Sequence, residues 1–213
     1  MITTLRSAKQ HTLYQTQYSV RKAHIDDVAA ILYLGKTTLG EGYLTTHGLY
    51  RDIADNIVYV ATYQGEPIGY CVAECLSPGE LKTQLLGHPE DPFPDLIQAD
   101  QLGRLGLLQA AGVNPCFRRN GIATSMLKDS IDDLIQRGVE AIIGLAWKTE
   151  TVHVGGVLDR LGFKPRQEYP HLWDMESIEK NYHCPVCGVP PCQCNGVLYS
   201  WNRSLDQGLL HYA

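Results

Sequence analysis

A short turn between an apolar strand and an amphipathic helix is the feature that most limits how this chain can fold. Residues 113–123 read Val-Asn-Pro-Cys-Phe-Arg-Arg-Asn-Gly-Ile-Ala. A strand is predicted over 105–113, and a helix over 122–137 follows the turn at once, with its apolar residues on one face and Gly138 at its end. The start of a helix has unpaired backbone N–H groups and the positive end of the helix dipole, so this junction suits a diphosphate.

Three residues of the turn strengthen that interpretation. Gly121 has no Cβ, so the backbone there can approach a phosphate closely. Arg118 and Arg119 can add charge-assisted hydrogen bonds. A plain basic turn between a strand and a helix is the alternative, and a six-residue pattern alone would not decide between the two.

The segment resembles the signature of the GNAT superfamily of acyl-CoA N-acyltransferases, which is Arg/Gln-x-x-Gly-x-Gly/Ala after a strand that ends in Val-x-Pro. This chain has Arg118-x-x-Gly121-x-Ala123, with Val113 and Pro115 in place. The resemblance extends over most of the chain in the order of its predicted elements, although only the signature is specific.

The predicted elements give an α/β fold in which a mixed sheet has helices on both faces. Strands are expected at 18–22, 57–63, 68–76, 105–113, 139–147, 163–168 and 196–202, and helices at 25–34, 49–54, 122–137 and 151–161. Glycines 35, 40 and 42 are expected to end the first helix. This order matches the GNAT acyl-CoA N-acyltransferase fold.

The expected organisation is a flexible arm at 1–17 and a single domain at 18–213 with two insertions. The first insertion, 77–104, is rich in proline and glycine and is interpreted as a flap beside the acceptor site, with a plain surface insertion as the alternative. The second, 171–195, is rich in cysteine and precedes the last strand.

Composition excludes several classes of protein. Hydrophobic residues make up 44% and charged residues 19%, as in ordinary globular domains, and the net charge of −5 argues against nucleic-acid binding as a function. No apolar run is long enough to span a membrane, and the first residues do not resemble a signal peptide. Seven cysteines without a secretion signal indicate a reducing compartment, so a cytoplasmic location is expected.

Four of those cysteines lie within eleven positions: Cys184, Cys187, Cys192 and Cys194. The first pair forms a Cys-Pro-x-Cys-Gly knuckle, which is typical of structural zinc sites, whereas the Cys-x-Cys spacing of the second pair is less usual. His171 or His183 could replace one ligand. Free thiols, a disulfide or an iron–sulfur cluster are the alternatives. Cys71, Cys75 and Cys116 are expected to be small apolar core residues.

The resemblance implies acetyl-CoA as donor and an amine of a small molecule or protein as acceptor, with a homodimer as one open arrangement. It implies a diphosphate on the N–H groups from Arg119 to Thr124 and a pantetheine arm along the end of the fourth strand. Gly112 is expected to be a place where that strand bulges. The implied donor-binding residues are Ala111, Gly112, Val113, Arg118, Arg119, Asn120, Gly121, Ile122, Ala123, Thr124 and Thr151.

Two catalytic positions depart from the family pattern. Many family members have a tyrosine that acts as general acid at the position where this chain has Leu158. The strand 105–113 contains no carboxylate that could act as a base, so Gln109 could at most orient a water. Glu74 is the candidate base, although an exposed strand glutamate is the simpler interpretation. Water could carry the proton transfers, with Glu74 or His153 assisting. The alternative function is a weakly active CoA sensor or adaptor that docks through its zinc knuckle.

Overall fold

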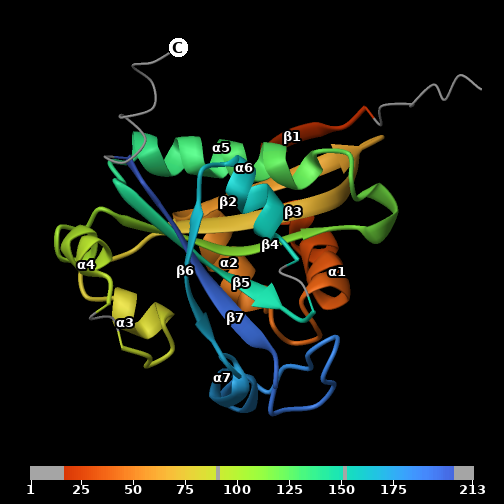
Figure 1. The fold of residues 1–213 in the computed structure, drawn as a ribbon. Helices are drawn as coiled ribbons and strands as arrows, with labels where there is room; N and C mark the ends of the chain where they lie inside the picture. The colour runs from red at the N-terminus through yellow and green to blue at the C-terminus, as the bar shows by residue number, and fades with distance from the viewer. Residues whose placement is uncertain (1–16, 90–91, 151–152, 204–213) are drawn as a thin grey trace, which may run out of the picture.

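The computed structural model describes residues 17–89, 92–150 and 153–203, whose centre is a seven-stranded sheet with the order β1-β2-β3-β4-β5-β7-β6 (Figure 1). All neighbouring strands are antiparallel except β4 and β5, which are parallel. The predicted mixed sheet is therefore confirmed. The strands are β1 Ser19–Lys22, β2 Ile57–Tyr63, β3 Glu66–Cys75, β4 Leu105–Val113, β5 Ala141–Lys148, β6 Lys164–Tyr169 and β7 Asn195–Asn202.

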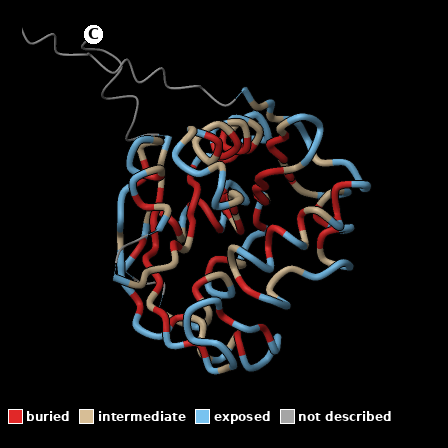
Figure 2. The backbone as a smooth tube through the Cα atoms, turned by 90° about the vertical axis from the view of Figure 1, so that its right-hand side faces the viewer, coloured by how far each residue is buried: buried red, intermediate tan, exposed pale blue. Residues whose placement is uncertain are grey.

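One face of the sheet is covered by α5 (Ile122–Gln136), the helix that follows the turn at 114–121. Its buried residues recur every three or four positions, so a single side of the helix meets the apolar side chains of β2, β3 and β4. Figure 2 shows the result, with buried residues concentrated in the interior and exposed ones in the peripheral loops. The start of α5 is thereby held next to the end of β4.

The opposite face is covered by α1 (Val28–Thr38) and α2 (Thr46–Asp55), preceded by the short 3-10 helix η1 (Ile25–Asp27). The structure corrects the expected end of the first helix, because α1 continues through Gly35 to Thr38. Gly35 permits close packing there, since a Cβ would lie 2.6 Å from Leu44 Cδ1 and that side chain would have to move. The longer helix brings Thr38 against Tyr70 of β3, with their hydroxyl oxygens 3.1 Å apart.

The insertion at 77–104 contains two helices, α3 (Leu81–Gln84) and α4 (Pro94–Gln101). Their apolar side chains, with Leu85 and Phe93, form a second core cluster against β4, β5 and β7. Asp95 ties α4 to the far edge of the sheet, because both guanidinium nitrogens Nη1 and Nη2 of Arg166 donate to its carboxylate at 2.8 Å. Asn202 of β7 donates to the same carboxylate.

This ion pair predicts an acid-dependent loss of stability. The hydrogen bonds from Arg166 lower the pKa of Asp95 from 3.8 to about 2, so the stabilisation is complete above pH 4 and lost as the pH falls toward 2. We expect Asp95→Asn to lower the free energy of unfolding by about 1 kcal/mol at pH 7, a value reduced for solvent screening. Urea titrations from pH 7 to pH 2 would measure this difference, and a difference that stays constant with pH would contradict the ion-pair account.

Two further elements differ from expectation. The helix predicted at 151–161 is only α6, Gly155–Arg160, within the residues described there. The cysteine-rich insertion contains the unpredicted helix α7, Asp174–Glu179, which is followed by the turns and loops that hold the cysteines. Over the described ranges, no helix combines the length and apolarity that a membrane crossing requires.

Candidate functional site

The candidate site is a cavity of about 800 Å³ that opens where the two parallel strands separate. The pairing of β4 with β5 runs from Leu105 opposite Ala141 to Leu108 opposite Gly144 and stops there. On its other side, β5 pairs with β7 along its whole length. Beyond Leu108, the described part of the chain gives β4 a strand partner only on its β3 side. The backbone of the last residues of β4 is therefore open on one edge, where an extended ligand can add to the sheet by hydrogen bonding.

A β-bulge at Gln109 marks the point of separation. Val72 of β3 pairs with Ala110 while Ala73 pairs with Leu108, so Gln109 is the extra residue on β4. The bulge expected at Gly112 is therefore wrong, because Gly112 pairs regularly with Tyr70. Glycine is needed at 112 for a different reason, since a Cβ there would lie 2.6 Å from Tyr70 Cε1 and would collide with the Thr38 hydroxyl.

The bulge has a chemical consequence at Gln109. A bulge can redirect a side chain, and here the Gln109 side chain lines the cavity. Its carbonyl oxygen Oε1 is buried and has no hydrogen-bond partner among the described residues. An unpaired buried carbonyl costs about 1–3 kcal/mol, so a side-chain rotation that brings Oε1 into contact with a bound N–H or O–H group is favoured.

One end of the cavity is the turn between β4 and α5. Gly121 is the N-cap of α5 and adopts φ +79°, and Arg119 adopts φ +68°. The first intrahelical bond runs from Ser125 N–H to the Gly121 carbonyl, so the N–H groups of residues 122–124 have no helical acceptor. Gly121 is exposed, which leaves this group of donors accessible to an anion.

Local hydrogen bonds hold the turn in that shape. The Asn120 amide donates to the carbonyls of Phe117 and Arg118 at 3.0 and 3.2 Å, and Arg118 Nε donates to the Val113 carbonyl at 3.1 Å. Asn120 therefore shapes the turn and does not line the cavity, whereas the other donor-binding residues predicted from 111 to 124 do. Thr151, the remaining predicted donor-binding residue, lies outside the described residues.

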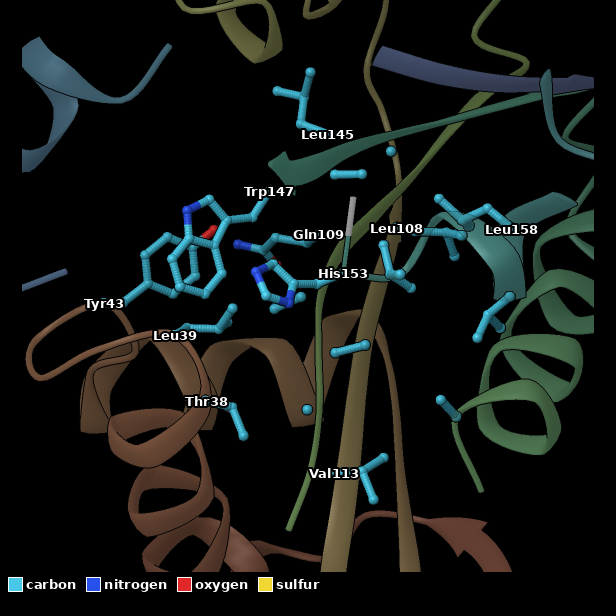
Figure 3. A pocket seen from close by; sticks show the side chains of 18 of the residues that line it. Thr38, Leu39, Tyr43, Leu108, Gln109, Val113, Leu145, Trp147, His153 and Leu158 are labelled. Atoms are coloured by element: carbon cyan, nitrogen blue, oxygen red, sulfur yellow. The ribbon is translucent and has the colours of Figure 1, made fainter. Parts of the chain in front are cut away.

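The other end of the cavity is aromatic. Tyr43 from the loop after α1, Trp147 from the end of β5, and Trp173 and Tyr182 from the cysteine-rich insertion all line it. Trp147 stacks on His153 with a centroid distance of 4.8 Å, and Tyr43 meets Tyr182 edge to face at 5.3 Å. Figure 3 shows Gln109, Trp147 and His153 extending into this end.

Among the described residues that line the cavity, Glu176 on α7 is the one with a carboxylate side chain. Its side chain is 12% exposed, accepts a hydrogen bond from the Tyr182 hydroxyl at 3.1 Å and pairs with Lys180. Glu74, the predicted base, does not line the cavity. Burial and the carboxylates of Asp52 and Glu80 raise the pKa of Glu74, which lies near the end of β3. Leu158 is buried in the lining, so the slot of the family tyrosine has no hydroxyl.

The four predicted cysteines come together beside the aromatic end. Their sulfurs all lie within 4.8 Å of one another, with Cys194 Sγ 3.8 Å from Cys184 Sγ and 3.4 Å from Cys187 Sγ. Backbone N–H groups of Val186 and Cys187 donate to Cys184 Sγ, and that of Gln193 donates to Cys187 Sγ. Neither His171 nor His183 belongs to this group among the described residues.

The remaining cysteines behave differently from one another. Cys71 is fully buried in the core, as predicted, and burial raises the pKa of its thiol to about 11. Cys75 and Cys116 are exposed, so the expectation that they are core residues is wrong. The last side chain of β3 and the turn after β4 both lie at the surface, where no apolar neighbour covers them fully.

Comparisons with known proteins agree with this geometry. Residues 34–163 match the acetyltransferase (GNAT) family. Among curated proteins, none matches the chain. Solved structures with the same fold include a ribosomal-protein-alanine N-acetyltransferase from Brucella melitensis, with 14% identity, a TM-score of 0.57, and 86% of this chain and 99% of that one covered.

Two further structures have the same fold. The protein yncA from Salmonella typhimurium, proposed to be an acetyltransferase and solved with acetyl-CoA, has 15% identity and a TM-score of 0.56, with 87% of this chain and 94% of that one covered. The loading GNATL domain of CurA from Lyngbya majuscula has 16% identity and a TM-score of 0.60, with 89% and 99% covered.

Proposed function

Because the chain belongs to the acetyltransferase (GNAT) family, we propose that it moves an acetyl group from acetyl-CoA directly to an amine in the cavity between β4 and β5. The observation that carries the proposal is the continuity of that cavity. Backbone donors at the start of α5 form one end, the open edge of β4 forms the middle, and aromatic residues form the other end.

The donor is assigned to the α5 end by its charge. A diphosphate accepts hydrogen bonds from the N–H groups of residues 119–124, while Arg118 and Arg119 add positive charge around it. A pantetheine arm carries amide groups, which can pair with the open edge of β4 from Ala110 to Val113. This arrangement directs the thioester toward Gln109, at the bulge.

The amine is assigned to the aromatic end, where the donor leaves space. Direct transfer forms the amide C–N bond and breaks the thioester C–S bond, so the amine must lose a proton and be held against the thioester, while CoA leaves as a thiolate that takes up a proton. Gln109 Oε1 is the unpaired acceptor that can hold an amine N–H or a water, and His153 is the imidazole in the lining that can take a proton. Both roles are carried by residues of the cavity, so Glu74 is not required.

We also propose that the four cysteines hold a structural zinc ion. Tetrahedral coordination with Zn–S bonds of about 2.3 Å places the sulfurs about 3.8 Å apart, which fits the observed spacings. The N–H groups that donate to Cys184 and Cys187 would stabilise thiolate charge. Four protein ligands leave no open position, so the ion would stabilise the insertion and take no part in the chemistry.

Product formation tests the proposal directly. Purified protein is mixed with acetyl-CoA and primary amines of different kinds, such as spermidine, free amino acids and a short peptide, and acetylated product is measured by mass spectrometry. We expect amine-dependent product for at least one class. Binding of CoA without product from any amine would instead support the sensor or adaptor function, which is motivated by Leu158 and the absence of a carboxylate from β4.

A further inference from the structure

The cysteine cluster and the amine end of the cavity are parts of the same wall. Cys184 and Cys192 line the cavity themselves. Trp147 and Trp173, which also line it, pack against the buried cysteines. A change in the arrangement of the sulfurs would therefore directly change the shape of the cavity lining.

Trp147 is the most direct of these connections. Its side chain packs against the buried cysteines of the cluster, its ring stacks on His153, and its backbone pairs with Gly196 of β7. The Trp147 ring thus touches the cysteine cluster on one side and the candidate proton acceptor on the other. Its position is set jointly by the sheet and by the sulfur it contacts.

A second connection runs through α7. The backbone N–H of Cys192 donates to Ser177 Oγ at 2.8 Å, and Ser177 is fully buried. The preceding residue on α7, Glu176, brings its carboxylate to the cavity and accepts the hydrogen bond of Tyr182. Cys192 therefore fixes the helix that supplies Glu176, the acidic residue of the lining.

The donor end is held by different interactions. The turn at 114–121 is shaped by Asn120 and Arg118, whose hydrogen bonds are all to residues between 113 and 118. The helix α5 packs on β2, β3 and β4. The cysteine cluster is not among these partners, so loss of order in the cluster should leave the donor end intact.

Because the cysteine cluster contacts the amine end of the cavity and not the donor end, we infer that metal occupancy of this cluster controls amine binding through Trp147 and leaves CoA binding unchanged. One cation that binds all four sulfurs keeps the insertion at 171–195 ordered. The insertion forms the amine wall, meaning the part of the cavity lining that includes Trp173, Glu176 and Tyr182. Linkage makes the effect reciprocal, so a bound amine would also increase metal affinity. The amine part of the inference rests on the proposed function, whereas the Trp147 part does not.

The test compares zinc-loaded protein with Cys187→Ser, which removes a ligand outside the cavity lining. The matched control is Cys75→Ser, which removes an exposed thiol outside the cluster. Zinc content, CoA affinity by calorimetry, and the KM and kcat for spermidine and tyramine are measured. Tryptophan emission and acrylamide quenching are compared with the same variants carrying Trp147→Phe, so that the Trp147 signal is isolated.

We expect one zinc per chain in the wild type and Cys75→Ser, and less in Cys187→Ser. In Cys187→Ser, Trp147 becomes more accessible to acrylamide, the amine KM rises at least about fivefold, and CoA affinity stays within about twofold. The inference is overturned if the wild type binds no zinc, if Trp147 does not respond, or if CoA affinity falls along with amine affinity. If no amine is acetylated, the proposed function fails, and the Trp147 signal still decides whether the metal shapes this wall.

Discussion

Gly121→Glu should abolish measurable CoA binding while the protein stays folded. A carboxylate at the N-cap of α5 places negative charge where the diphosphate is expected, and at a separation of about 4 Å such repulsion costs several kcal/mol. The backbone there has φ +79°, so a side chain adds about 1 kcal/mol of strain. We expect the dissociation constant for CoA to rise at least about 100-fold, as measured by calorimetry.

Gly138→Glu provides the matched control. Gly138 follows the other end of α5, has φ +92°, and has open space where a Cβ would project. It therefore carries the same kind of backbone strain far from the proposed donor site. Both variants should show a similar small fall in melting temperature, but CoA should stabilise only Gly138→Glu. Equal CoA affinity in the two variants would place the diphosphate somewhere else.

Gln109→Leu should make the protein more stable and less active. The substitution removes a buried carbonyl oxygen that has no partner, so the free energy of unfolding should rise by about 1 kcal/mol. The same oxygen is the proposed contact for the amine or its water, so kcat should fall by about 10- to 100-fold. Urea denaturation and initial rates at saturating acetyl-CoA would measure the two effects.

The conservative variant Gln109→Glu separates the chemical role from the packing role. It keeps an acceptor oxygen at the bulge, and we expect it to retain more activity than Gln109→Leu. CoA affinity should be similar in all three proteins, because the diphosphate contacts lie at the far end of the cavity. A fully active Gln109→Leu would exclude this residue from the reaction.

The sequence was sufficient to predict the sheet, the signature turn and the cysteine cluster. Each depends on local patterns: β-rich runs at the strands, the 3.6-residue period of α5, and the spacing of Cys184, Cys187, Cys192 and Cys194. These signals act within one element or one turn. Long-range packing does not have to be known to read them.

The bulge and the amine wall could not be predicted in the same way. The pairing of Val72 with Ala110 and of Ala73 with Leu108 depends on how two distant strands align, and Gly112 offered a misleading local signal. The lining by Trp147, Glu176 and Tyr182 depends on where β5 and the insertion meet. The position of Glu74 near a strand end favours it as a base in the sequence, but the face of the sheet that it occupies follows from the register of β3 against β4.

The most direct test of the account is a crystal structure of the protein with CoA bound. The account predicts the diphosphate oxygens within about 3.2 Å of backbone nitrogens in residues 119–124, with the pantetheine arm along Ala110–Val113 and its sulfur near Gln109. A diphosphate bound elsewhere, or a turn whose N–H groups are covered by side chains when CoA is present, would contradict it.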